Sequence, residues 1–291
     1  MRKFRHTPIK SKKIPIGIPY IISNEAAERF SFYGMKGILV IYMTQYLSLT
    51  TGETNLSEAS AKGYFHLFTS AVYFFPILGA IISDFFFGKY KTIIFLSLVY
   101  CLGHFVLAID PSKIGLSIGL SLIAIGSGGI KPCVSAHLGD QFNKKNVSLI
   151  SKAYSWFYLA INLGAFTSTL LIPYILEKYS AELAFGIPGI FMFLATLFFW
   201  MGRYKFIHIK PMKKKSFLEL FNKKNIKILI KLLIIFIYVS FFWCLFDQTG
   251  SSWILQAEKM DRKIFGVELL SAQILSANPI MILIFTPIFF K

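Results

Sequence analysis

Four ionisable side chains interrupt an apolar run in the stretch NEAAERFSFYGMKG, residues 24–37. They are Glu25, Glu28, Arg29 and Lys36. The surrounding sequence, residues 14–47, otherwise has the character of one continuous apolar helix. A charged side chain at the middle of a bilayer costs about 2.5 to 3.5 kcal/mol on insertion scales. Four such residues in one membrane helix would therefore need a specific environment.

The composition is typical of a polytopic membrane protein. Of the 291 residues, 55% are hydrophobic and only 15% are charged, whereas about 25% of a soluble domain is charged. A transmembrane helix needs ~20 mostly apolar residues, and polar or turn-rich segments separate eight such runs. The runs lie at about 14–47, 62–87, 92–110, 114–138, 152–176, 184–202, 228–255 and 269–290. The sequence therefore predicts an all-α membrane protein.

The basic residues are distributed unevenly between the loops of this predicted topology. Twenty of the 31 Lys and Arg residues lie in the N-terminal segment and in the loops on its side of the membrane, and six lie in the loops of the opposite side. Basic loops remain in the cytoplasm, so we expect a multi-pass protein of the cell (plasma or inner) membrane with a cytoplasmic N-terminus. The net charge of +17 then faces anionic lipid headgroups of the bilayer, and no nucleic acid is expected as a partner.

One long basic segment divides the chain. Residues 203–227 form a predicted cytoplasmic linker between a six-helix bundle at 1–202 and a second, incomplete bundle at 228–291. Within the linker, SFLELF at residues 216–221 predicts a short amphipathic helix at the membrane surface.

The remaining chemistry of the sequence gives no support to an enzyme. Cys101, Cys133 and Cys244 lie in apolar runs and are interpreted as core-filling residues. The five histidines form no HxxxH pair, and no nucleophile, base and orienting group occur together. We therefore expect no metal site and no cofactor.

The charged stretch has helical spacing. Glu25, Glu28, Arg29, Tyr33 and Lys36 recur three or four positions apart, so they share one helix face about three turns long. In one interpretation they form a structural salt-bridge cluster. In the other, Glu25 or Glu28 exchanges a proton, because protonation would release a basic partner, which is the physical basis of proton-coupled transport.

A further isolated charge, Lys131, lies in the fourth apolar run, within GSGGIKPCVSAHLGDQF at residues 126–142. The glycines lack the GK[ST] ending and the preceding strand of a phosphate-binding loop. They predict instead a close approach between helices. An unpaired ammonium group in lipid would be untenable, so Lys131 needs a partner or a cavity.

At this point several segments resemble one family. ERFSFYGMKG is similar to the ExxERFxYYG signature of the proton-dependent oligopeptide transporters, a branch of the major facilitator superfamily. The segment around Lys131 agrees with it, as do three later segments in the same order. These are FYLAINLGAF at 157–166, FFWCLFDQTGSSWILQA at 241–257 and ANPIMILIFTPIF at 277–289.

The resemblance implies a major facilitator-like fold and a set of roles for individual residues. Proton coupling would involve Glu25, Glu28, Arg29 and Lys131. The peptide site would contain Tyr33, Lys36, Tyr73, Lys131, Tyr158, Asn162, Trp243 and Asn278. Cytoplasmic gating would involve Asp84, Gly88 and Lys89 of the loop SDFFFGKYKT at 83–92, with Asp247 as a charge between the bundles.

Two departures from the family pattern matter. Position 36 is Lys where the family usually has Arg, and Lys lacks the bidentate fork that grips a carboxylate. The family also has at least twelve helices, whereas eight are predicted here, so the chain resembles the N-terminal two-thirds of a transporter, truncated after the eighth helix.

The leading hypothesis is proton-coupled symport that imports di- and tripeptides, with peptides, protons and the lipid bilayer as partners. One alternative keeps the proton coupling and changes the cargo to another small nitrogenous solute. Another is a non-transporting relic or membrane scaffold that pairs with a separately encoded C-terminal half.

Overall fold

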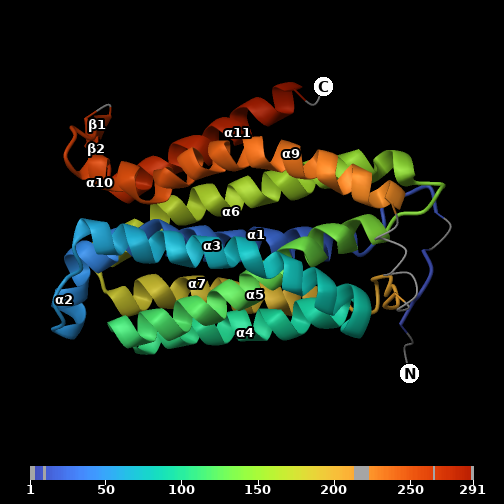
Figure 1. Cartoon of the computed structure of the whole chain (residues 1–291), viewed down its shortest axis with the longest axis horizontal. Coiled ribbons are helices and arrows are strands. Elements are labelled where there is room, and N and C mark those ends of the chain that lie inside the picture. The colour runs from blue at the N-terminus through green and yellow to red at the C-terminus, as the bar shows by residue number, and fades with distance from the viewer. Residues whose placement is uncertain (1–3, 9–10, 213–222, 265, 290–291) are drawn as a thin grey trace.

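Long helices packed lengthwise make up most of the chain (Figure 1). The computed structural model describes residues 4–8, 11–212, 223–264 and 266–289. The first six long helices of this part are α1 (Ile18–Ile41), α3 (Glu58–Ile82), α4 (Lys89–Ile109), α5 (Lys113–Asp140), α6 (Ile150–Lys178) and α7 (Ala181–Met201). The all-α architecture expected from the sequence is confirmed.

Helix α1 lies at the centre of these six. It packs against α6 and α7 along most of its length, while α4 contacts α5 and α7, and α3 contacts α5. Small residues permit the closest approaches. A Cβ on Gly164 of α6 would lie 2.4 Å from the carbonyl oxygen of Ala26 in α1, and one on Gly79 of α3 would lie 2.2 Å from that of Gly129 in α5. Gly129 thus has the packing role predicted for the glycine cluster.

Two of the predicted continuous runs change their helical form near one end. The run at 14–47 becomes α1, then a π-helical turn Tyr42–Tyr46 and the short helix α2 (Leu47–Thr51). Similarly, α3 continues as a π-helical turn Ser83–Phe87. Periodicity alone did not predict these changes, because a π-turn keeps the run apolar and continuous.

The seventh predicted run is broken. It divides into α9 (Lys223–Phe246), a 3-10 segment Asp247–Gly250 and α10 (Ser252–Glu258). A two-stranded antiparallel hairpin follows, β1 (Lys263–Ile264) with β2 (Val267–Glu268), which the sequence did not predict. The chain then forms a 3-10 segment Ser271–Ser276 and α11 (Ala277–Phe289), which packs on α6.

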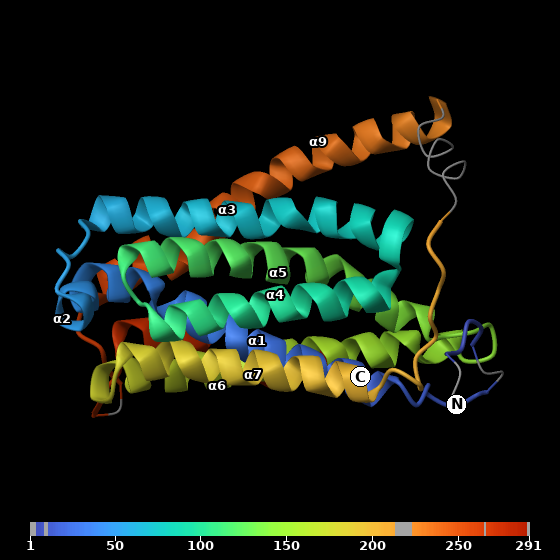
Figure 2. The same ribbon diagram turned by 90° about the horizontal axis from the view of Figure 1, so that it is seen from below.

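The two ends of the structure differ. We call the end at β1 and β2 the hairpin end, and the end at residues 203–212 the linker end. Figure 2 shows α9 leaning away from α3 as it approaches the linker end. At the hairpin end, by contrast, the segment around α10 lies against α1.

At the linker end, the N-terminal segment pairs with the segment that follows α7. The backbone amide of His208 donates to the carbonyl of Arg5 at 2.7 Å, and Arg5 and Ile207 form an isolated parallel bridge. Residues 223–227, placed in the linker by the sequence, belong to α9. The predicted amphipathic helix at 216–221 lies outside the described residues.

Within the described residues, six helical segments are long and apolar enough to cross a membrane. They are Glu58–Phe87, Lys89–Ile109, Lys113–Asp140, Val147–Lys178, Ala181–Met201 and Asn225–Glu258. Helix α1 has sufficient length, with 24 residues, but it carries the four charges of the opening stretch. The described part of α11 has 13 residues. The chain is therefore a multi-pass membrane protein, as predicted.

Candidate functional site

The two glutamates of α1 surround one arginine. Arg29 Nε lies 2.7 Å from Glu25 Oε1 and 3.2 Å from Glu28 Oε2. Both glutamates are 2% exposed, so the three charges are withdrawn from the surface of the bundle. The close packing of Gly164 against Ala26 brings α6 next to this turn of α1. Because breaking a buried ion pair leaves an uncompensated charge, protonation of either carboxylate would alter the whole cluster.

Lys131 of α5 faces aromatic rings. Its ammonium nitrogen lies 4.3 Å from the ring centre of Phe32 and 5.4 Å from that of Tyr73. Within the described residues, no carboxylate oxygen lies within 4.0 Å of this nitrogen. Cation–π contacts of this kind stabilise an ammonium group only modestly. Lys131 thus keeps its capacity to bind an anionic group.

Lys36 has a different environment. Its ammonium nitrogen lies 3.2 Å from Asp247 Oδ1, and 5.1 Å from the ring centre of Phe65. The pair joins α1 to the 3-10 segment that follows α9, so the predicted peptide ligand Lys36 and the predicted inter-bundle charge Asp247 are brought together. In this structure the Lys36 ammonium therefore has a carboxylate partner from the same chain.

The other predicted peptide-site residues spread along several helices. The ring centre of Trp243 in α9 lies 6.5 Å from that of Tyr73, and Tyr73 is in turn one of the rings near Lys131. The Asn162 amide donates to the Tyr158 carbonyl at 2.8 Å within α6. Tyr33 is partly buried on α1, and Asn278 at the start of α11 is exposed. No hydrogen bond or ion pair joins Asn162, Tyr158 or Asn278 to Lys131 in the described part of the chain.

The predicted gating residues lie at the linker end. Asp84 lies in the π-turn after α3, and its carbonyl accepts from the Met212 amide at 2.7 Å. Gly88 has φ +78°, which favours glycine, and a Cβ there would lie 3.3 Å from the Ile209 carbonyl oxygen. Lys89 Nζ lies 2.7 Å from Asp140 Oδ2. The segment at 209–212 therefore packs directly on this loop, which the sequence did not indicate.

Sequence reasoning missed one polar link at the hairpin end. His66 Nε2 of α3 and Ser251 Oγ lie 3.0 Å apart. His66 follows Phe65, whose ring lies near the Lys36 ammonium, and Ser251 directly follows the 3-10 segment that begins at Asp247. The spacing of the histidines bears only on a metal site, and a single His in an apolar run does not indicate its distant partner.

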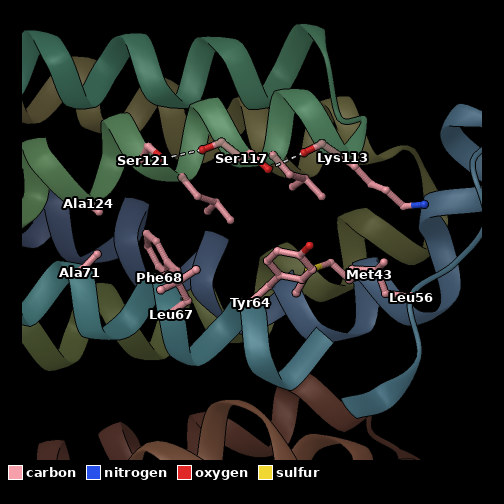
Figure 3. Close-up of a pocket in the computed structure, with 12 residues that line it drawn as sticks. Met43, Leu56, Tyr64, Leu67, Phe68, Ala71, Lys113, Ser117, Ser121 and Ala124 are labelled. Carbon is pink, nitrogen blue, oxygen red and sulfur yellow. Dashed lines mark hydrogen bonds between the residues drawn. The ribbon is translucent and has the colours of Figure 1, made fainter. Parts of the chain in front are cut away.

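Two cavities lie away from these residues. A groove of about 200 Å³ between α3 and α5 is lined by apolar side chains such as Leu67 and Phe68, with Lys113 at one end (Figure 3). A larger cavity of about 660 Å³ at the hairpin end is lined by Glu177, Glu258 and Arg262 among others. Neither contains a residue that the sequence assigned to the proton, peptide or gating sites.

Comparison with known proteins identifies the family. The sequence profile described as the POT family matches residues 90–224 and 219–291. The chain belongs to the POT family. The match confirms the family resemblance, since its ranges contain the similar segments at 126–142, 157–166, 241–257 and 277–289, and it also covers α7.

Relatives of the POT chain agree with this assignment. It is 38% identical to "Peptide transporter family 1" of Drosophila melanogaster over 94% of its own length and 42% of that protein. It is 37% identical to "Solute carrier family 15 member 2" of Homo sapiens, covering 94% of this chain and 44% of the human protein. The chain thus spans less than half the length of these curated relatives. They are transporters rather than enzymes, as the sequence predicted for this chain.

Solved structures confirm the fold. The crystal structure of the POT family transporter PepTSo superposes with a TM-score of 0.82 at 37% identity, covering 94% of this chain and 68% of that one. A second proton dependent oligopeptide (POT) family transporter gives a TM-score of 0.79 at 38% identity, covering 93% and 70%. The POT chain therefore has the major facilitator-like architecture expected from its sequence.

Proposed function

We propose that this chain takes part in proton-coupled symport that imports di- and tripeptides. The observation that carries the proposal is the contrast inside the bundle. Glu25, Glu28 and Arg29 form an ionic cluster, while Lys131 lies over aromatic rings and, within the described residues, has no carboxylate oxygen within 4.0 Å. Membership of the POT family and the printed name of the Drosophila relative support peptide as the cargo.

The proton step is assigned to the cluster on α1. A proton that reaches Glu25 or Glu28 removes one negative charge from beside Arg29, so the arginine loses part of its local neutralisation. The guanidinium group keeps its charge at every relevant pH, and it must then find another anionic group. A peptide carboxylate entering the site could supply that charge, which couples cargo to protonation.

The peptide step is assigned to the residues around Lys131. Its ammonium group would bind the peptide carboxylate, while the rings of Tyr73 and Trp243 would provide an apolar wall that tolerates varied side chains. Asn162 would contribute its amide after leaving its contact within α6. Lys36 would contact peptide only after its pair with Asp247 opens.

The predicted membrane topology gives the orientation of the proposed site. With a cytoplasmic N-terminus in the plasma or inner membrane, the linker end and its gating residues face the cytoplasm. Alternating access requires two bundles to rock around a central site. Peptide import then requires that the bundle containing α9 and α11 moves against the bundle of the first six long helices.

Uptake by reconstituted protein tests the proposal. Liposomes containing the folded chain receive an inward proton gradient and labelled dialanine, with free alanine as a competing solute. We expect the unsubstituted chain to take up dialanine and Glu28→Gln to abolish this uptake. The control variant Glu182→Gln, which changes an exposed glutamate on α7, should leave uptake unchanged. Absence of uptake in a well-folded preparation refutes symport by this chain alone. Equal competition by free alanine would instead assign a different nitrogenous cargo.

A further inference from the structure

A buried hydrogen bond links α1 to α4 through two residues that the proposed mechanism does not use. Ser31 Oγ of α1 and His104 Nε2 of α4 lie 2.8 Å apart, and both side chains are 0% exposed. The two helices run in the same direction, because both begin beside the linker end. Gly17 abuts Phe206 just before α1, and Gly88 abuts Ile209 just before α4.

This register places Glu28 opposite Tyr100. Glu28 precedes Ser31 by three positions and Tyr100 precedes His104 by four, so each lies one turn earlier on the same helix face. Since α1 and α4 are parallel, one turn back on both helices brings these two side chains together. The Tyr100 hydroxyl is thus near enough to the Glu28 carboxylate for a side-chain hydrogen bond.

Tyr100 has little freedom to point elsewhere. It is 0% exposed, and its ring stacks on that of His104 with centroids 5.1 Å apart. From the other side, a Cβ on Gly126 of α5 would lie 2.7 Å from the Tyr100 Cβ, so the backbone of α5 closes against it. Packing therefore fixes the ring, while its hydroxyl retains rotational freedom.

Both polar groups of this pair are unsatisfied. Within the described residues, neither oxygen of Glu28 accepts a hydrogen bond and the Tyr100 hydroxyl has no partner. The contact of Glu28 with Arg29 is an ion pair at 3.2 Å without hydrogen-bond geometry. Buried polar groups are nearly always paired, and a carboxylate that only accepts lies next to a hydroxyl that can donate.

We infer that the Tyr100 hydroxyl donates a hydrogen bond to the ionised Glu28 carboxylate, which makes Tyr100 a positioning residue for proton exchange at Glu28. Its role in transport rests on the proposed function, whereas the contact itself does not. When Glu28 gains a proton, the hydroxyl can turn toward the neighbouring Ser31. The ionisable groups around Glu28 are Glu25, Arg29 and Tyr33 on α1, Tyr100 and His104 on α4, and Lys131 on α5.

Infrared titration of the full chain in lipid vesicles tests the inference without requiring transport. The carboxylic acid C=O band that Glu28→Gln removes reports protonation of this one side chain. We expect its midpoint to move to higher pH by about one unit in Tyr100→Phe, because the charged form loses a donor. Tyr90→Phe on the same helix, whose ring stacks on Phe199 near the linker end, provides the matched control and leaves the midpoint unchanged.

The outcomes separate this inference from the proposed function. A Tyr100→Phe midpoint equal to that of the unsubstituted chain overturns the inference, as does a spectrum with no Glu28-dependent band. If the midpoint moves but no variant takes up dialanine, the contact stands and the proposed symport fails. If the midpoint moves and the unsubstituted chain takes up dialanine, the pH dependence of uptake by Tyr100→Phe shifts in the same direction as the band. The KM for dialanine at low pH then stays constant.

Discussion

Two lysines inside the same bundle have opposite surroundings. Lys36 is 13% exposed and pairs with Asp247, itself 15% exposed, across 211 positions of sequence. Lys131 faces the rings of Phe32 and Tyr73, with no carboxylate at ion-pair distance in the described residues. The difference shows that two lysines of one bundle can be distinguished by the groups that packing places beside their charges.

The largest effect is expected from a substitution that breaks the ion pair between Lys36 and Asp247. Asp247→Asn leaves the Lys36 charge partly buried without its partner, which should lower the free energy of unfolding by about 3 kcal/mol. Unfolding measured in bilayers checks the value. The double variant Lys36→Met, Asp247→Leu should recover most of the loss, because it removes both charges. A single variant as stable as the unsubstituted chain would show that the pair does not join the segments.

The unpaired lysine should matter for binding rather than for folding. Lys131→Gln should weaken dialanine binding by about 10- to 100-fold, the value of a charge-assisted hydrogen bond. Equilibrium dialysis on the purified chain measures this loss, and Lys131→Arg, which keeps the charge, should retain more affinity. If Lys131→Gln binds dialanine normally but unfolds more easily, the comparison between the two lysines is wrong.

A smaller effect is expected for the hydrogen bond between Ser251 and His66 at the hairpin end, which joins the same segments as the environment of Lys36. Ser251→Ala removes the contact with His66 and should lower the free energy of unfolding by about 1 kcal/mol, as for an ordinary neutral hydrogen bond. The neighbouring variant Ser252→Ala is the control, since its hydroxyl bonds only locally to Gln248. A Ser251→Ala variant as stable as the unsubstituted chain would show that the link between α3 and this segment contributes nothing.

The smallest effect concerns an exposed pair in the same region. Lys259 Nζ lies 3.2 Å from Glu58 Oε1, but their side chains are 64% and 50% exposed. Lys259→Ala should therefore change the free energy of unfolding by less than about 0.5 kcal/mol. A loss near that of Asp247→Asn would mean that ion pairs at this end act as one network.

Patterns within single helices were predictable from the sequence. The spacing of Glu25, Glu28 and Arg29 predicted a shared helix face, and the structure places a carboxylate oxygen of each glutamate within 3.2 Å of Arg29 Nε. The glycines near Lys131 predicted close helix packing, which the approach of Gly79 to Gly129 shows. Both depend on the 3.6-residue repeat and on side-chain size, which are local properties.

Contacts between distant segments were not predictable in the same way. Nothing near Lys36 in the sequence indicates Asp247, and nothing near Glu28 indicates Tyr100. The break in the seventh predicted run was also not predictable. Apolar stretches lie on both sides of FDQTG, so the sequence suggests one continuous helix, although α-helical structure ends before Asp247. Family motifs pointed to Lys131 and Tyr73, yet they did not tell which lysine would be paired.

The sequence by itself determined the membrane environment, the helical architecture, the family and the charged face of α1, since each follows from composition, periodicity or a local motif. Only the tertiary structure decided which charge meets which partner. In a medium with little water, a buried charge is stabilised by the few groups that packing brings within about 4 Å. That choice depends on helix register and crossing, which no single stretch of sequence encodes.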